Sequence, residues 1–350
     1  MNMNPTTFHF NPGDAFVAYS LPGESDYFLM TSINEKDPVL SPDDLKDEGF
    51  IFHPFIPSEV SPPIFLKAKA IMKNPVFSFK AGSGDIPETI SKEHFLRLAN
   101  QFIRASSGEY LKLVLSRIKT IKNGEMELYE LFLALHEKYD QAFVYLFNHP
   151  LTGCWMGATP EMLLRSDQGV MKTIALAGTK LYDPSEINGY WSPKDRMEQD
   201  IVVQYLENTL KAHHLKYAMK GPEDQRAGHL VHLKTSFSFE LPEDIFGLIH
   251  HLHPTPAVCG IPKNKSLEYI AEHEKHDRLY YAGFLGPVHH EQKLDLFVNL
   301  RCMHIFNEAF VLYAGSGIIP DSFAEGEWEE TERKFRTMQD IIEWIQNKNN

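Results

Sequence analysis

Apolar residues recur at helical spacing in two parts of this chain, and two further parts also indicate helices. The first set, from Phe95 to Ile103, follows Ser91, a residue type that caps helix N-termini. Residues 195–212 also have apolar residues on one side, and residues 125–139 and 325–346 indicate two further helices. The expected helices therefore cover residues 91–103, 125–139, 195–212 and 325–346.

Short apolar or alternating runs between these helices predict strands. In residues 294–302, apolar and polar positions alternate, which predicts a strand with one apolar face. Residues 1 to about 90 indicate strands and irregular loops, and six of the 26 residues from Pro38 to Pro63 are prolines. The remaining expected strands cover residues 110–118, 142–147, 169–177 and 310–314.

The order of these elements predicts the fold class. Strands occur in groups with helices between them, without strict alternation, which favours an α+β fold with mainly antiparallel sheets over a doubly wound one. No stretch indicates a domain boundary, so residues 1–350 are expected to form one domain.

Composition and charge exclude several classes of protein. The 350 residues are 43% hydrophobic and carry 34 basic and 47 acidic side chains, a net charge of −13. That charge argues against a nucleic-acid binder, and the chain lacks the roughly 18-residue apolar run of a membrane-spanning helix. Three scattered cysteines form neither a disulfide framework nor a zinc site, and the N-terminus lacks a signal-peptide pattern, so a cytoplasmic location is expected.

Two of the expected helices each carry a pair of acidic residues three positions apart. Asp195 and Glu198 form the first pair, and Glu327 and Glu330 the second. This spacing places both carboxylates of a pair on one helix face. Two such faces that meet would hold a divalent cation such as Mg²⁺, which prefers oxygen ligands. The alternative is a solvated acidic surface.

Glycine-containing segments follow two of the expected strands. The segments are Ala177-Gly178-Thr179-Lys180 and Ala314-Gly315-Ser316-Gly317. Glycine lets backbone N–H groups approach an oxyanion, although ordinary strand-end turns are the alternative. Arg301 is expected at the end of the alternating strand, on the face opposite its apolar residues, where it can bind a carboxylate or simply face solvent. Neither segment matches a nucleotide-binding motif.

Lys112 and Glu161 are candidate proton-transfer groups. Lys112 lies within an apolar strand, and Glu161 precedes the apolar run 162–164. Burial would lower the pKa of the lysine and raise that of the carboxyl, which would make the first a base and the second an acid. Both residues could instead face solvent.

Ten ordered segments together resemble the chorismate-utilising enzymes, which include isochorismate, salicylate, anthranilate and aminodeoxychorismate synthases. The resemblance covers residues 90 to about 340, whereas the first 90 residues match poorly. The segments are Lys-Leu-Val-Leu-Ser-Arg (112–117), Gly-Ala-Thr-Pro-Glu (157–161), Leu-Ala-Gly-Thr (176–179), Lys-Asp-Arg-Met-Glu (194–198), His-Leu-Lys-Thr (232–235), His-Pro-Thr-Pro-Ala-Val-Cys-Gly-Ile-Pro-Lys (253–263), Tyr-Tyr-Ala-Gly (280–283), Leu-Arg-Cys (300–302), Tyr-Ala-Gly-Ser-Gly-Ile (313–318) and Gly-Glu-Trp-Glu-Glu-Thr (326–331).

The resemblance implies a single α+β domain of two large, mainly antiparallel sheets with helices packed outside. It implies Mg²⁺ as the cofactor, bound directly by Glu198 and Glu330 and through water by Asp195 and Glu327. Relatives often have Glu at the position of Asp195. The remaining implied contacts are to chorismate: Arg301, Tyr281 and the backbone of Gly315, Ser316 and Gly317 at its pyruvyl carboxylate, Gly178 and Thr179 near its ring carboxylate, and His232 in the cavity wall.

Three positions indicate which member of the family this chain resembles. Aminodeoxychorismate synthases have a lysine where this chain has Ala177, and anthranilate synthases typically have Gln at the position of Lys112. Lys112 is typical of members that use water, with Glu161 as the acid. Ala257 resembles the isochorismate-forming members, whereas salicylate-forming ones tend to have Thr there. The sequence therefore predicts an isochorismate synthase that needs no protein partner.

Alternatives remain at this stage. They are a salicylate synthase, an anthranilate-synthase-like component, a non-catalytic relative that binds chorismate or a protein, and an acidic binding module. The sequence does not distinguish menaquinone from siderophore biosynthesis.

Overall fold

The computed structural model describes residues 7–32, 40–124, 126–167, 169–183, 191–227, 230–290 and 293–349. Within these ranges the strands are β1 (Phe8–Phe10), β2 (Phe16–Ser20), β3 (Phe28–Ser32), β4 (Gly49–His53), β5 (Ile64–Lys73), β6 (Phe77–Phe79), β7 (Lys112–Lys122), β8 (Phe143–His149), β9 (Gly153–Thr159), β10 (Met162–Asp167), β11 (Val170–Leu181), β12 (Tyr217–Ala227), β13 (Leu230–Glu240), β14 (Gly260–Ile261), β15 (Phe284–His289), β16 (Lys293–Val298), β17 (Cys302–Ile305) and β18 (Ala309–Ile318). The helices are α1 (Lys92–Ser106), α2 (Leu128–Lys138), α3 (Pro193–Ala212), α4 (Ile245–Leu252), α5 (Lys263–His273), α6 (Ala324–Asn349) and the short 3-10 helix η1 (Pro42–Lys46).

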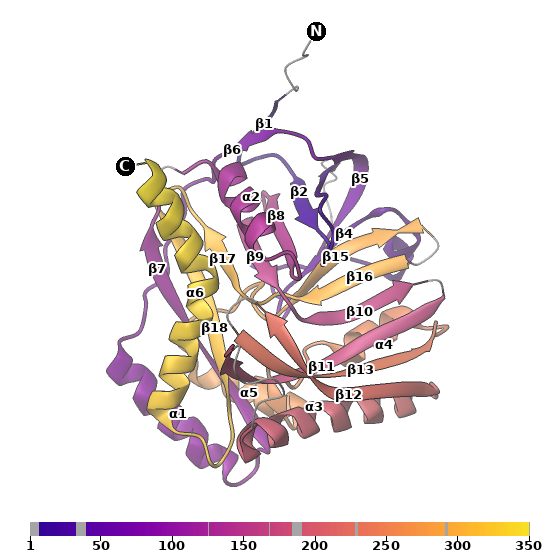
Figure 1. The fold of residues 1–350 in the computed structure, drawn as a ribbon, viewed down its shortest axis with the longest axis vertical. Coiled ribbons are helices and arrows are strands. Elements are labelled where there is room, and N and C mark those ends of the chain that lie inside the picture. The colour runs from indigo at the N-terminus through magenta and orange to yellow at the C-terminus, as the bar shows by residue number, and fades with distance from the viewer. Residues whose placement is uncertain are drawn as a thin grey trace.

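The α+β fold with mainly antiparallel strands is confirmed, and its two large sheets are continuous with each other. Among the described residues, sixteen strands pair in the order β12-β13-β11-β10-β16-β15-β4-β5-β3-β2-β8-β9-β17-β18-β7-β14. β5 joins the two halves, because Ile64–Lys67 pair with β4 and Ala68–Lys73 pair with β3. Strands from the first 90 residues therefore occupy the middle of the sheet (Figure 1).

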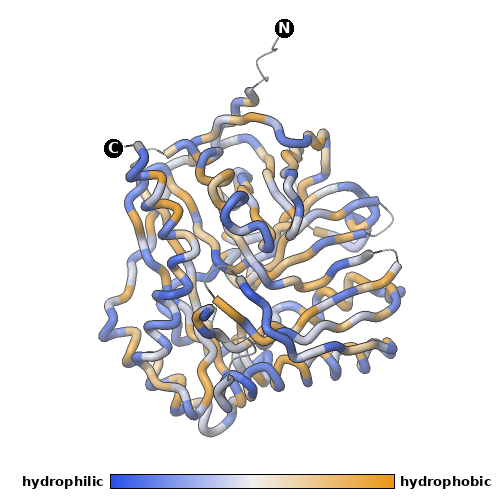
Figure 2. Tube along the Cα trace, in the orientation of Figure 1, coloured by the Kyte–Doolittle hydropathy of each residue, from blue (hydrophilic) through white to orange (hydrophobic). Residues whose placement is uncertain are grey.

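All four predicted helices are present. Ser91 caps α1 by accepting a hydrogen bond from the backbone N–H of His94, and Ser192 caps α3 in the same way with Asp195. α3 packs on β11 and β13, whereas α6 packs on β18 and β7. Both helices lie on the outside of the sheet, and hydrophilic and hydrophobic segments alternate along them (Figures 1 and 2).

The core has two layers because much of the sheet is buried on both faces. In β8, Tyr145 and Phe147 point toward the other half of the sheet, and Val144 and Leu146 point toward the outer helices. The inner layer is rich in aromatic rings. The ring centroids of Phe52 and Phe147, for example, are 4.2 Å apart.

The prediction of one strand over residues 294–302 is wrong. β16 ends at Val298, residues 299–301 form a turn, and β17 begins at Cys302. Asn299 anchors this turn by donating to the Tyr280 carbonyl and accepting from the Tyr145 hydroxyl, at 2.8 and 2.6 Å. Since β16 is buried on both faces after Lys293, its alternating sequence does not mark one exposed face.

The prediction that the glycine segments follow strands is also wrong. Gly178 lies inside β11 and Gly315 to Gly317 lie inside β18. The register of β11 shifts between Ala177 and Lys180, and Gly178 has a φ of +69°. Glycine within a strand is typical of a bulge or of close backbone approach, and Gly178 shows the first.

In the part of the chain that the structure describes, no helix combines the length and apolar character needed to cross a lipid bilayer.

The assignment of residues 1–350 to one domain stays a prediction.

Candidate functional site

A cavity lies where the two halves of the sheet meet α3 and α6. The space between its walls amounts to about 710 Å³, a figure that includes open solvent. Most of the predicted site residues line it. The full lining is Lys112, Val114, Pro160, Glu161, Leu176, Ala177, Gly178, Glu198, His232, Ala257, Val258, Tyr281, Leu300, Arg301, Tyr313, Ala314, Gly315, Ser316, Gly317, Glu330 and Lys334.

Lys112 extends from β7 into this cavity and is 2% exposed. Its Nζ donates to Glu198 Oε2 on α3 at 3.3 Å. Gly317, on the neighbouring strand β18, leaves room for this pair. A Cβ at residue 317 would lie 2.7 Å from Glu198 Oε2 and 2.8 Å from Lys112 Cε. The structure thus brings together a buried amine and a carboxylate that are 86 residues apart in sequence.

Glu161 lies between β9 and β10 and is 5% exposed. Its carbonyl accepts a hydrogen bond from Val298 N–H at 2.9 Å, which ties this segment to the end of β16. Burial raises the pKa of its carboxyl from 4.5 to about 7, although Lys112, Lys334 and Arg301 oppose this rise through their positive charge. At neutral pH this carboxyl therefore holds a proton in a substantial fraction of molecules.

Arg301 lies in the turn after β16, with a φ of +48°, and is 8% exposed. Among the described residues, its guanidinium makes no hydrogen bond or ion pair. Burial lowers the pKa of its guanidinium to about 10. Electrostatic interactions with Tyr281, Glu330 and, more weakly, other neighbours act in the opposite direction. A buried guanidinium that lines a cavity provides a forked binding site for a carboxylate.

His232 and Ser316 contribute an imidazole and a hydroxyl to the cavity wall. The Gly178 carbonyl lies 2.9 Å from His232 Nδ1 and can only accept, so Nδ1 carries the hydrogen and Nε2 is an acceptor. Burial, followed by the charge of Arg301, lowers the pKa of His232 to about 3. Ser316 Oγ is buried and has no hydrogen-bond partner among the residues that the structure describes, as expected of a group that binds a ligand.

The four predicted metal ligands occupy two kinds of position. Glu198 and Glu330 line the cavity, whereas Asp195 and Glu327 are not among its lining residues. Asp195 contacts Ser192 at the start of α3, with Ser192 Oγ to Asp195 Oδ2 at 2.5 Å, and lies beside the Gly178 bulge. Glu327 is 2% exposed. Within the described ranges, no three acidic, histidine or cysteine side chains are grouped as a metal site.

Glu198 and Glu330 fit Mg²⁺ in their chemistry. Both offer carboxylate oxygens at the cavity wall, and Mg²⁺ needs only one or two direct carboxylates. Each is paired with a lysine, Glu198 with Lys112 and Glu330 with Lys334 at 2.7 Å. Metal binding would therefore have to compete with these two ammonium groups.

Ala177 and Ala257 line the cavity with small side chains, and Tyr281 stacks on Tyr313 at 5.4 Å between ring centroids. Thr179 lies in β11, but its side chain is outside the described residues. Four residues with predicted roles in the site thus line the same cavity: Lys112, Glu161, His232 and Arg301.

Sequence reasoning missed Lys334. It lies one helical turn after Glu330 on α6 and also donates to the Gly315 carbonyl at 2.8 Å. The i, i+4 spacing from a candidate metal ligand was the signal that could have indicated it.

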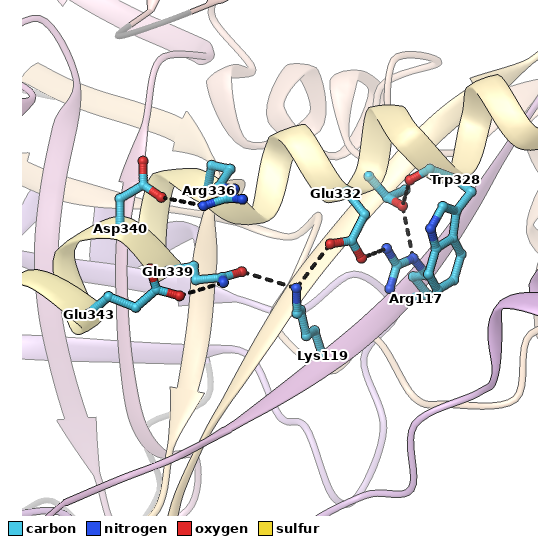
Figure 3. Close-up of polar contacts among 9 residues, drawn as sticks. Arg117, Lys119, Trp328, Glu332, Arg336, Gln339, Asp340 and Glu343 are labelled. Carbon is cyan, nitrogen blue, oxygen red and sulfur yellow. Dashed lines mark hydrogen bonds and ion pairs between the residues drawn. The ribbon is translucent and has the colours of Figure 1, made fainter. Parts of the chain in front are cut away.

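A second missed feature fixes α6 against β7. Arg117 donates to Thr331 and Glu332, and its guanidinium carbon lies 3.5 Å from the ring centre of Trp328 (Figure 3). Lys119 also donates to Glu332, at 2.9 Å. These contacts lie next to Glu330 in sequence and hold the helix that carries it.

Comparison with known proteins identifies the family. Residues 70–343 match the family model described as chorismate binding enzyme, so the chain belongs to the chorismate-binding enzymes. Isochorismate synthase EntC of Escherichia coli K12 is 34% identical over 210 residues, which cover 57% of this chain and 54% of that protein. The salicylate biosynthesis isochorismate synthase of Pseudomonas aeruginosa PAO1 is 29% identical over 272 residues, which cover 75% and 57%. The alignments thus span little more than half of these relatives.

Solved structures share the fold. MenF, the menaquinone-specific isochorismate synthase from E. coli, superposes with a TM-score of 0.80 at 20% identity, covering 95% of this chain and 89% of that one. Anthranilate synthase component I from Streptococcus pneumoniae TIGR4 superposes with a TM-score of 0.71 at 16% identity, covering 97% and 92%.

Proposed function

We propose that this protein isomerises chorismate to isochorismate with Mg²⁺ as its cofactor. The observation that carries the proposal is that Lys112 and Glu161, a candidate base and a candidate acid, are both buried and line one cavity. The relatives named isochorismate synthases support the same reaction.

The cavity offers a site for each carboxylate of chorismate. Arg301 and Tyr281 would bind the pyruvyl carboxylate, together with the backbone of the glycine-rich segment of β18. The ring carboxylate would lie toward Glu198 and Glu330, where a cation would offset the negative charge that the ligand adds to the two carboxylates. The chemistry that Mg²⁺ supplies when bound there is charge neutralisation and a fixed attachment for the ring carboxylate.

The reaction needs a proton acceptor and a proton donor. Lys112 Nζ would accept the proton of a water molecule as the water oxygen bonds to ring carbon C2, which requires that the ammonium paired with Glu198 first release a proton. The ring double bonds shift, and the C4 hydroxyl takes the proton of Glu161 and leaves as water. One water enters and one leaves, so the product is an isomer of the substrate. Each proton transfer contributes about 10²–10⁴-fold.

Salicylate formation is the second candidate, because the P. aeruginosa relative carries salicylate biosynthesis in its name. That activity requires pyruvate elimination after isochorismate has formed. Ala257 lines the cavity where salicylate-forming members tend to have threonine, so this chain lacks the hydroxyl that such members place there. We therefore propose isochorismate as the released product.

Product identification tests this proposal. The purified chain is incubated with chorismate, with and without Mg²⁺ after EDTA treatment, and the products are separated by chromatography. Isochorismate that forms only with Mg²⁺ is the expected result. If salicylate and pyruvate form without an added lyase, the second candidate is correct and the proposal is wrong. Unchanged chorismate would refute both candidates. Activity of the chain alone would also support the absence of an obligatory protein partner.

A further inference from the structure

A buried ion pair lies behind the cavity wall and takes no part in the proposed chemistry. Arg278 follows α5 and donates to Glu274 twice, from Nε at 2.8 Å and from Nη2 at 2.6 Å. Both side chains are 3% exposed. Burying two charges costs several kcal/mol per ion, so such a pair is weak evidence for stability and calls for another explanation.

The other Arg278 hydrogen bonds join two segments of the cavity wall. Nη1 donates to the Val258 carbonyl at 2.7 Å, and Nη2 donates to the Val114 carbonyl at 2.8 Å. Val114 is two residues after Lys112 on β7, and Val258 follows Ala257. β14 pairs directly with β7 at residues 112 and 113, and the planar guanidinium adds a second connection between β7 and the segment that carries Ala257.

Glu274 holds β7 at Ser116, two residues after Val114. It accepts from the Ser116 backbone N–H at 2.6 Å and from Ser116 Oγ at 3.0 Å. Alternate residues of a strand share a face, so Lys112, Val114 and Ser116 are successive positions on one side of β7. The ion pair thus restrains β7 two and four residues away from the amine.

The proline-rich segment covers this ion pair. The Phe55 ring centre lies 4.4 Å from the Arg278 guanidinium carbon, and Phe55 N–H donates to the Leu279 carbonyl at 2.9 Å. The Tyr280 hydroxyl donates to the Pro62 carbonyl at 2.7 Å. Phe55 therefore covers one face of the Arg278 guanidinium, and both side chains of the pair are 3% exposed, which strengthens their hydrogen bonds.

We propose that Arg278 is a positioning residue for the reaction, which sets the Lys112 amine relative to residue 257 through Glu274 and two backbone carbonyls. The inference rests on the proposed function. Lysine at residue 278 would keep the charge but lose the planar fork, so it cannot reach Glu274, Val114 and Val258 at once. Displacement of β7 by a fraction of an ångström would then move the base away from the water.

The test compares Arg278→Lys with Arg165→Lys. Arg165 of β10 pairs with Asp295 of β16 at 2.7 Å, is 34% exposed and does not line the cavity, so it controls for the weakening of an arginine–carboxylate pair away from the site. We expect both variants to stay folded at the assay temperature, with kcat lowered by about tenfold or more only in Arg278→Lys and the KM for chorismate changed by less than about threefold. Deuterium exchange in peptides 112–116 and 255–260 should be faster only in that variant. Glu274→Gln should show the same changes and carries the test if Arg278→Lys does not fold.

Several results would overturn the proposal. A folded Arg278→Lys with wild-type kcat would do so, and so would a loss of kcat equal to that of the control. Wild-type protein that leaves chorismate unchanged would instead refute the proposed function. The exchange comparison would then decide the role of the ion pair, since equal exchange in both variants would contradict it.

Discussion

The Glu161→Gln substitution tests both the burial of this carboxyl and its proposed role. Glutamine keeps the shape of the side chain but cannot ionise. In the wild type the pKa of Glu161 rises from 4.5 in the unfolded chain to about 7 in the folded one, because burial disfavours the carboxylate. The folded state therefore binds this proton more tightly. The resulting stabilisation is fully present below pH 4.5 and is lost as the pH rises through about 7.

This rise in pKa corresponds to about 3 kcal/mol of unfolding free energy. The stability of Glu161→Gln relative to wild type should therefore increase by about 3 kcal/mol between about pH 4.5 and about pH 8.5. Urea denaturation at both pH values, without metal, measures this difference. Glu88→Gln is the control, because Glu88 is exposed. A relative stability that does not change with pH would refute the burial argument.

The same variant has a predicted effect on catalysis. A glutamine amide cannot donate the proton that the C4 hydroxyl needs, so kcat should fall by about 10²–10⁴-fold. In the wild type, kcat should decrease as the pH rises above about 7, because the carboxylate form cannot act as an acid. A Glu161→Gln variant with wild-type kcat would remove Glu161 from the mechanism while leaving the stability prediction intact.

Three further substitutions test the cavity. Lys112→Ala should abolish turnover while chorismate still binds with Mg²⁺ by calorimetry; full activity would exclude the base role. Glu198→Gln should raise the Mg²⁺ concentration needed for half-maximal rate or eliminate activity, and an unchanged titration after EDTA treatment would count against it as a ligand. Gly317→Ala places a Cβ 2.7 Å from Glu198 Oε2, so kcat should fall by about tenfold or more with little change in melting temperature. Wild-type kcat would show that the Lys112–Glu198 pair can shift freely.

Local signals were sufficient for the helices and for several strands. α1 and α3 begin after serine caps, and their apolar faces repeat at helical spacing, so short-range interactions determine where they start. The turn at residues 299–301 could not be predicted, because Asn299 is held by Tyr145 and Tyr280, which are distant in sequence. Alternation also fails as a signal where helices and sheet bury both faces of a strand.

The candidate site depended on the family resemblance more than on residue patterns. Lys112 and Glu198 meet only through the packing of α3 on the sheet, which no spacing between them reveals. Glu274 and Arg278 were missed for a different reason. Their i, i+4 spacing is typical of a solvent-exposed helical pair, yet α5 ends at His273 and both side chains are buried.

The way in which β5 bridges the sheet bears on how this chain can be shortened. The family match begins at residue 70, whereas β2, β3, β4 and most of β5 precede it. Cutting the chain at that boundary would leave β15 and β8 without their partners β4 and β2. Two apolar strands, of six and seven residues, would then present unpaired backbone groups, the condition under which sheets join edge to edge and aggregate.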